Sequence, residues 1–121
     1  MYAAAAALKR FFSGFGIPAY DEDTVPQDVS VPYITYSVRV PEWNQKASMY
    51  ARVWDRTTSN AAIIRKADEI TGEIGSGIIL DTEDGQIVIW PETPLVQIMS
   101  DGDFRCAYIN LSVNNYHMPG V

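Results

Sequence analysis

The sequence predicts an α+β protein, a two-layer sandwich in which two helices pack on one face of a mainly antiparallel β-sheet. Three segments, residues 32–40, 48–55 and 105–114, alternate apolar and polar side chains, which is typical of strands with one buried face. Two others, residues 2–13 and 61–74, repeat apolar residues at helical spacing. Long alternating strands favour an antiparallel sheet with one covered face, and amphipathic helices would cover it.

The N-terminal segment is predicted to be a helix from residue 2 to about residue 13. Alanine, the best helix former, fills positions 3–7, and large apolar residues follow at i, i+3, i+4 and i+7, namely Leu8, Phe11, Phe12 and Phe15. Gly14 and Gly16 end this helix. Pro18 enforces an extended backbone, so residues 17–20 are expected to form a short strand.

The two alternating segments that follow are predicted to form a hairpin, because the connection at residues 41–46 is short. One face of the pair is apolar and carries Ile34, Tyr36, Val38, Val40, Met49, Ala51 and Val53. The opposite face carries Tyr33, Thr35, Ser37, Arg39, Tyr50, Arg52 and Trp54. With Tyr108 this second face is more aromatic than a monomer needs, so we expect it to meet a partner, most economically another copy of the chain.

The second helix is predicted over residues 61–74. Its apolar stripe consists of Ile63, Ile64, Ala67, Ile70 and Ile74, and charged residues take the opposite side. Ser59 or Asn60 can accept hydrogen bonds from the free amides of the first turn. Gly75 and Gly77 offer the positive φ that ends a helix.

The C-terminal third is predicted to contain three strands. Residues 78–80 and 86–90 flank a turn marked by Asp84 and Gly85, and Pro91 and Pro94 are expected to break the ladder after the second strand. In the last strand, over residues 105–114, the inward side chains are Ala107, Ile109, Leu111 and Val113, and the outward ones are Cys106, Tyr108, Asn110 and Ser112. Residues 115–121 carry no pattern and are expected to form a flexible tail, so residues 1–121 make a single domain.

Composition excludes several classes of protein. The formal net charge of −6 argues against a nucleic-acid grip, which needs a basic patch, although a like charge would let DNA slide past without sticking. Cys106 is the one cysteine, so no intrachain disulfide can form and the chain suits a reducing compartment. No apolar run approaches the length that spans a bilayer, and the start lacks the features of a signal peptide. We therefore expect a soluble protein.

Few residues suggest chemistry. A thiol hydrolase would need Cys106 activated by the one histidine, His117, and a lone cysteine in a strand is more often a packing residue. The acidic pairs lack the calcium-loop pattern, the segment around Gly75 lacks the phosphate-loop lysine, and no zinc spacing is present. We therefore expect no catalytic residues, no metal and no cofactor.

Loops are the predicted contact sites. Trp43 lies in the hairpin connection, where a tryptophan is either an interface anchor or folds back on its own sheet. The predicted interaction residues are Asp21, Glu22, Asp23, Glu42, Trp43, Lys46, Asp81, Glu83 and Asp84. For the acidic connection of residues 21–30, the commoner alternative is a loop that simply faces water.

The order of several short motifs resembles the tail terminator (tail completion) proteins of long-tailed bacteriophages. The matching segments read Gly-Ile-Pro-Ala-Tyr-Asp at residues 16–21, Val-Pro-Tyr-Ile-Thr-Tyr at 31–36, Val-Trp-Asp-Arg at 53–56 before the second helix, and Phe-Arg-Cys-Ala-Tyr-Ile-Asn-Leu-Ser-Val at 104–113. The second is similar to the family's Pro-Tyr-Val/Ile-Thr-Tyr strand. The resemblance extends over nearly the whole chain.

This resemblance implies a virion structural protein at the tail–neck junction, assembled in the host cytoplasm. Such a protomer forms a homo-hexameric ring that caps the tail tube, terminates tail polymerisation and presents the surface that joins the head connector. Its partners would be its own copies, the major tail tube protein and the head–tail connector or stopper protein. Viral DNA would pass through the lumen without specific binding, and no membrane is involved. Another head–tail connector or stopper component, and the thiol hydrolase using Cys106 and His117, are the alternatives.

Overall fold

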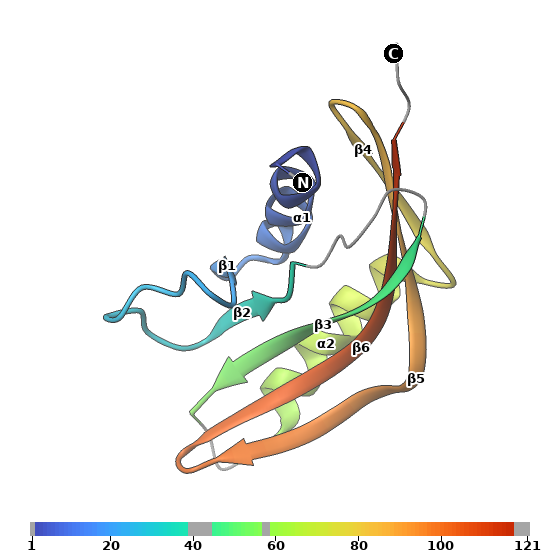
Figure 1. Cartoon of the computed structure of the whole chain (residues 1–121). Helices are drawn as coiled ribbons and strands as arrows, with labels where there is room; N and C mark the ends of the chain where they lie inside the picture. Colours follow the sequence, from blue (N-terminus) through green and yellow to red (C-terminus); the bar gives the residue numbers. More distant parts are fainter. Residues whose placement is uncertain (1, 39–44, 57–58, 118–121) are drawn as a thin grey trace.

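The computed structural model describes residues 2–38, 45–56 and 59–117 and confirms the α+β class (Figure 1). The elements, in chain order, are α1 (Tyr2–Phe12), the 3-10 helix η1 (Ser13–Phe15), β1 (Ala19–Asp21), β2 (Tyr33–Tyr36), β3 (Lys46–Asp55), α2 (Ala61–Ile74), β4 (Ile78–Thr82), β5 (Gly85–Asp101) and β6 (Phe104–His117). The first alternating segment is thus a shorter strand than predicted, and Arg39, Val40, Glu42 and Trp43 lie outside the described residues.

All six strands form one sheet in the order β1-β2-β3-β6-β5-β4. Every pair is antiparallel except β1 and β2, which run parallel with Ala19 opposite Ile34. The hairpin predicted between the two alternating segments is confirmed by the antiparallel pairing of β2 with β3, in which Ile34 faces Val53. The central β3–β6 pair, ten residues long on each strand, contacts α2, whereas α1 contacts β1, β4 and β5.

The sheet curls so far that α1 contacts both of its edge strands, β1 and β4 (Figure 1). Two neighbouring basic side chains at the C-terminal end of α1 donate hydrogen bonds to the backbone of the two edge strands, β1 and β4. Lys9 Nζ donates to the carbonyl oxygen of Ala19 at 2.5 Å, and Arg10 Nη2 donates to that of Asp81 at 3.1 Å. Because these carbonyls lie on strands far apart in the sheet order, α1 holds the curl closed from within.

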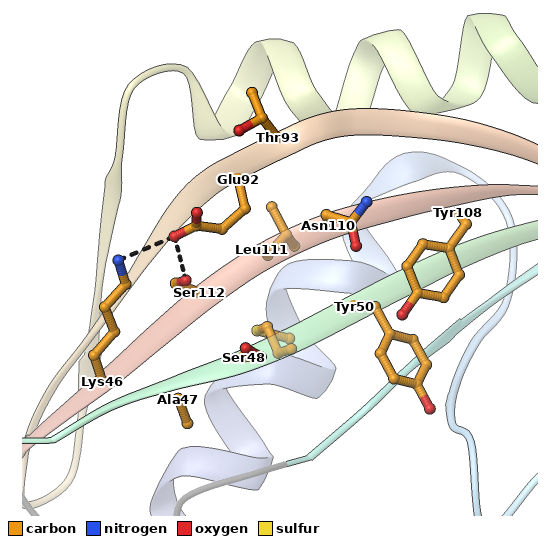
Figure 2. Close-up of a pocket in the computed structure, with 11 residues that line it drawn as sticks. Lys46, Ala47, Ser48, Tyr50, Glu92, Thr93, Tyr108, Asn110, Leu111 and Ser112 are labelled. Carbon is orange, nitrogen blue, oxygen red and sulfur yellow. Dashed lines mark hydrogen bonds and ion pairs between the residues drawn. The ribbon is translucent and has the colours of Figure 1, made fainter.

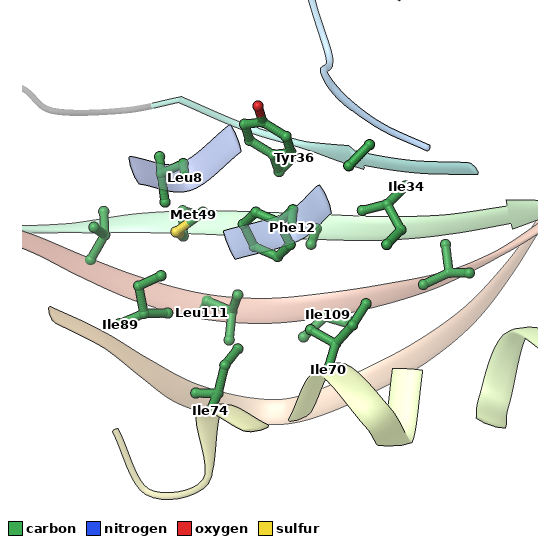
Figure 3. Close-up of a cluster of buried hydrophobic side chains, with 14 of the residues drawn as sticks. Leu8, Phe12, Ile34, Tyr36, Met49, Ile70, Ile74, Ile89, Ile109 and Leu111 are labelled. Atoms are coloured by element: carbon green, nitrogen blue, oxygen red, sulfur yellow. The ribbon is translucent and has the colours of Figure 1, made fainter. Parts of the chain in front are cut away.

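The core lies between the helices and the face of the sheet that they cover (Figure 3). The predicted inward side chains of β3 and β6 are all buried there, including Val53, Ile109 and Leu111. Ala4 and Ala7 of the alanine-rich helix are buried too, so their small side chains let α1 approach the sheet closely. Burial of one large aliphatic or aromatic side chain contributes about 1.5–3 kcal/mol, so this face supplies most of the stability of the fold.

The second helix differs from its prediction in one residue. Ile63, Ala67, Ile70 and Ile74 are buried, but Ile64 is 40% exposed, because it lies one residue off the stripe that faces the sheet. The predicted cap is confirmed for Ser59, whose Oγ accepts from the amide of Ala61 at 3.2 Å. The predicted stop is confirmed by Gly75, which has a φ of 58° and donates its amide to Thr71 O at 2.8 Å.

The predicted break of the ladder at Pro91 and Pro94 is confirmed, but the strand β5 does not end at Trp90 as predicted. It continues to Asp101, and its pairing with β6 is irregular between Pro91 and Val96. Proline lacks a backbone N–H, and the β5 residues between Pro91 and Val96, which include Pro94, have no partner in the β6 register. The partner strand also exceeds its prediction, because β6 includes residues 115–117 that were assigned to the tail, and Asn115 is buried.

Candidate functional site

The face of the sheet that the helices leave uncovered, here called the open face, carries a layer of aromatic side chains. The register places Tyr33 opposite Trp54, and Arg52 between Thr35 and Tyr108. The aromatic second face expected from the alternation is therefore confirmed for Tyr33, Tyr50, Trp54 and Tyr108. Several small or polar residues of the open face are nonetheless buried: Thr35, Cys106, Ser112 and Asn114.

A cation lies at the centre of this aromatic layer. The guanidinium carbon of Arg52 is 4.8 Å from the ring centroid of Tyr50, 5.2 Å from that of Tyr108 and 5.7 Å from that of Trp54. Each distance is within the roughly 6 Å over which a cation is attracted to a ring. We call these four residues the Arg52 cradle.

Further contacts hold the rings of the cradle in place. Tyr50 and Tyr108 stack, with centroids 5.0 Å apart and planes inclined by 24°. Trp54 Nε1 donates to Thr35 Oγ1 at 2.9 Å, and the Tyr50 hydroxyl donates to a carboxylate oxygen of Glu22. This hydrogen bond, followed by burial, raises the pKa of Tyr50 above its usual range. The cradle is therefore a rigid arrangement with its orientation set by its neighbours.

Arg52 itself has no anionic partner among the described residues. The ion pairs there join Lys46 with Glu92 at 3.0 Å and Lys66 with Glu69 at 2.9 Å. The Nε atom of Arg52 is buried without a hydrogen-bond acceptor. Buried arginine N–H groups normally donate hydrogen bonds. The Nε–H of Arg52 is therefore an exception, because it has no acceptor among the described residues.

Beside the cradle, a cavity of about 500 Å³ opens between β3, β6 and the irregular part of β5 (Figure 2). Glu92 Oε1 accepts from Ser112 Oγ at 2.5 Å and pairs with Lys46, and these two contacts lower the pKa of Glu92. Asn110 Nδ2 donates to the carbonyl oxygen of Pro94 at 2.5 Å. The polar groups of this cavity thus bond one another and stabilise the bend of β5, which gives them a structural role.

The predicted acidic loop lies on the edge strand β1 and just after it. Asp21 Oδ1 accepts from the amide of Asp23 at 3.0 Å, which forms a local turn, and Glu22 orients Tyr50. The structure therefore connects one of the three predicted acids, Glu22, to the cradle. Asp23 is exposed.

The predicted residues of the β4–β5 turn lie elsewhere. Asp81 Oδ1 accepts from Gln86 Nε2 at 3.3 Å, and Asp84 Oδ1 accepts from Thr82 Oγ1 at 3.1 Å. Glu83 is exposed. Lys46, besides its pairing with Glu92, lies 5.9 Å from the ring centroid of Trp90. The predicted residues are thus spread over separate loops and strands, and Arg52, which organises the aromatic face, was not among them.

The thiol-hydrolase alternative meets a geometric obstacle. Cys106 and His117 both lie on β6, eleven positions apart, so their backbones are on the order of 30 Å apart in one protomer. The thiol is buried, and burial raises the pKa of Cys106, with a smaller opposing effect from Arg52. A reactive cysteine needs a lowered pKa and an adjacent base. The proposed pairing of Cys106 with His117 within one chain is therefore wrong.

An exposed apolar edge is a second feature that the sequence interpretation missed. β4 pairs with β5 over residues 85–89, and β6 pairs with it on the other side as far as Asp101. The described chain offers no strand to the remaining edge, where Ile98 is 37% and Met99 is 49% exposed. The overlooked signal was the apolar run that continues beyond the two prolines.

Comparison with known proteins adds no family assignment. No protein-family model matches this chain, and no curated protein or solved structure matches it either. Among the described residues, no three side chains of the metal-ligating types gather in one place. No helix within the described ranges is long and apolar enough to cross a bilayer.

Proposed function

We propose that this chain is a structural assembly protein of a bacteriophage tail, a terminator that forms a ring on the end of the tail tube. The observation that carries the proposal is the open face, where four aromatic side chains and a cation with no anionic partner among the described residues lie on a sheet surface that no described element covers. Such a surface on a small domain is typical of a protein that functions by association. The order of the tail-terminator-like motifs gives the type of assembly.

In this proposal each protomer presents its open face to other protein subunits. One set of contacts joins copies of the chain into a hexameric ring, and others attach the ring to the major tail tube protein and to the head connector or stopper. The net charge of −6 suits a ring through which DNA moves without binding. The ring would stop tube growth by occupying the tube end, and it would be part of the virion at the tail–neck junction.

The oligomeric state tests the ring. Size-exclusion chromatography with light scattering should give about 81 kDa, since six protomers of 13.5 kDa add to that mass, and negative-stain images should show rings. When wild-type protein is added to growing tail tubes of the virus that encodes it, tubes should become uniformly capped and stop lengthening. Tubes from an unrelated virus are the control and should keep growing.

The neighbouring alternative, a connector or stopper component, is separated by the binding partner. A terminator binds tails that have no head, whereas a connector or stopper binds filled heads that have no tail. Co-sedimentation with the two purified particles distinguishes these outcomes. A chain that stays monomeric, both alone and with tail tubes, and caps neither particle contradicts the whole proposal.

A further inference from the structure

We propose that Arg52 is an inter-subunit anchor that binds a carboxylate of the β5–β6 turn, Asp101 or Asp103, of a neighbouring copy of this chain. This inference rests on the proposed function, because it names the contact through which copies associate. It concerns two surfaces of the same protomer, the Arg52 cradle and the turn at residues 101–103. Among the described residues, the cradle has a cation without an anionic partner, and the turn has carboxylates without a cationic partner.

The cradle supplies an oriented cation. Contacts with ring faces attract the guanidinium without using its N–H groups as donors. Nε is buried, so the two Nη atoms are the donors available to an approaching group. A guanidinium of fixed orientation binds a carboxylate through two parallel hydrogen bonds, and the surrounding rings exclude water and strengthen the attraction. The acceptor that fits is therefore a carboxylate on an otherwise apolar surface.

Acids of the same protomer near the cradle do not supply this acceptor. Glu22 accepts from the Tyr50 hydroxyl, and no carboxylate of the described residues lies within ion-pair distance of Arg52. Asp101, at the end of β5, acts electrostatically on Cys106 of β6, but it forms no ion pair with Arg52 in the protomer. The described part of the chain thus offers no acceptor, and we place the acceptor on another copy of the chain.

The β5–β6 turn has the required chemistry. Asp101 and Asp103 are exposed, and neither carboxylate bonds a described residue. The turn follows Met99, which is paired with Cys106, lies on the open face and is 49% exposed, so an apolar side chain accompanies the acids on that face. The acids at Asp21, Asp81 and Asp84 accept hydrogen bonds from their own chain. Charge and apolar surface thus coincide at the β5–β6 turn.

In this contact the cradle of one copy binds the β5–β6 turn of the next copy, so the two patches that meet are different. When one patch of a subunit binds a different patch of the next, the contact repeats around a ring and closes if the rotation between subunits permits. Figure 1 shows the β5–β6 turn at the far end of the β5–β6 hairpin, away from α1 and the β4 edge. A contact there leaves both termini of the described chain and α1 free for other partners.

Charge reversal in two separate variants tests the contact. The cradle variant is Arg52→Glu, and the turn variant is Asp101→Lys with Asp103→Lys. Each alone should place like charges in every contact and weaken association at least about tenfold, measured as the mid-point concentration of assembly by light scattering and native mass spectrometry. Mixed in equal amounts, the two variants should assemble again, because every contact between unlike copies joins opposite charges.

Matched controls show that charge alone is not the cause. Arg65→Glu, and Asp68→Lys with Glu73→Lys, make the same charge changes on the exposed side of α2 and should leave assembly unchanged. Circular dichroism melts of all variants verify folding. Variants that melt like wild type but still fail to assemble have lost the contact and not the fold.

The outcomes separate this contact from the proposed function. If wild type forms rings and Arg52→Glu forms them equally well, the anchor is overturned while the ring stands. If each variant fails alone and the mixture also fails, the β5–β6 turn is not the partner of Arg52. If wild type stays monomeric at every concentration, with and without tail tubes, both proposals are overturned.

Discussion

The two faces of the sheet carry the same alternation of residues but have opposite surroundings. On the covered face, residues such as Ala51, Ile109 and Leu111 pack against two helices of their own chain and are almost completely buried. On the open face, Tyr50, Arg52 and Tyr108 pack against one another and remain partly exposed. Alternation predicts which side chains share the covered face, but it does not tell how the side chains of the open face pack on one another.

The open face is nevertheless not a simple wetted surface. Cys106 and Ser112 are buried in it although they point away from the core, because the aromatic and long side chains around them cover them. Thr35 is buried as well and bonds Trp54. Because this layer is already partly buried, a partner that binds it has little further water to displace. The covered face is thus completely packed within the chain, whereas the open face is only partly packed.

The largest contrast should appear when a core residue is truncated. Ile109→Ala removes a fully buried side chain from the covered face, and we expect a loss of about 2–5 kcal/mol in the free energy of unfolding, measured by urea denaturation. The matched control, Ile64→Ala, removes the same atoms from a position that is 40% exposed and should cost under about 1 kcal/mol. Equal losses for the two variants would mean that α2 is rotated from the orientation described.

On the open face, truncation should affect association more than stability. Tyr108→Ala removes the stacking with Tyr50 and a ring contact of Arg52, for which we expect about 1–2 kcal/mol in urea denaturation. The same variant should assemble poorly, because the cation loses its fixed orientation. A variant that is as unstable as Ile109→Ala would place Tyr108 in the core and contradict the distinction between the faces.

The smallest expected effect is the change in the stability of the fold with pH. Burial raises the pKa of Cys106 above 9.0 and that of Tyr36 above 10.0. Because the unfolded chain releases these protons first, stability is full below pH 9 and falls as pH rises through the higher folded values. Urea midpoints between pH 8 and pH 11 should therefore decline, and Cys106→Ala should flatten the first part of the decline. A midpoint that rises with pH in this window would contradict the assigned burial.

Local pattern determined most of the scaffold. The positions of both helices, the Ser59 cap, the Gly75 stop and the face of each residue in β3 and β6 all follow from side-chain spacing, because they depend on interactions within a few residues. The candidate site was only partly predictable. Its aromatic members follow from alternation, whereas the position of Arg52 over three rings depends on the pairing of β3 with β6.

Tertiary structure decided what spacing could not. The path of β5 through Pro91 and Pro94 depends on a register shift against β6, and the parallel pairing of β1 depends on how the loop after Asp21 returns. The closure of the curled sheet depends on Lys9 and Arg10 reaching strands that are distant in sequence. The chain alone thus set the two chemical faces of the sheet. Long-range packing brought α1 and α2 onto the predicted apolar face, and it placed Arg52 over three rings on the face left open.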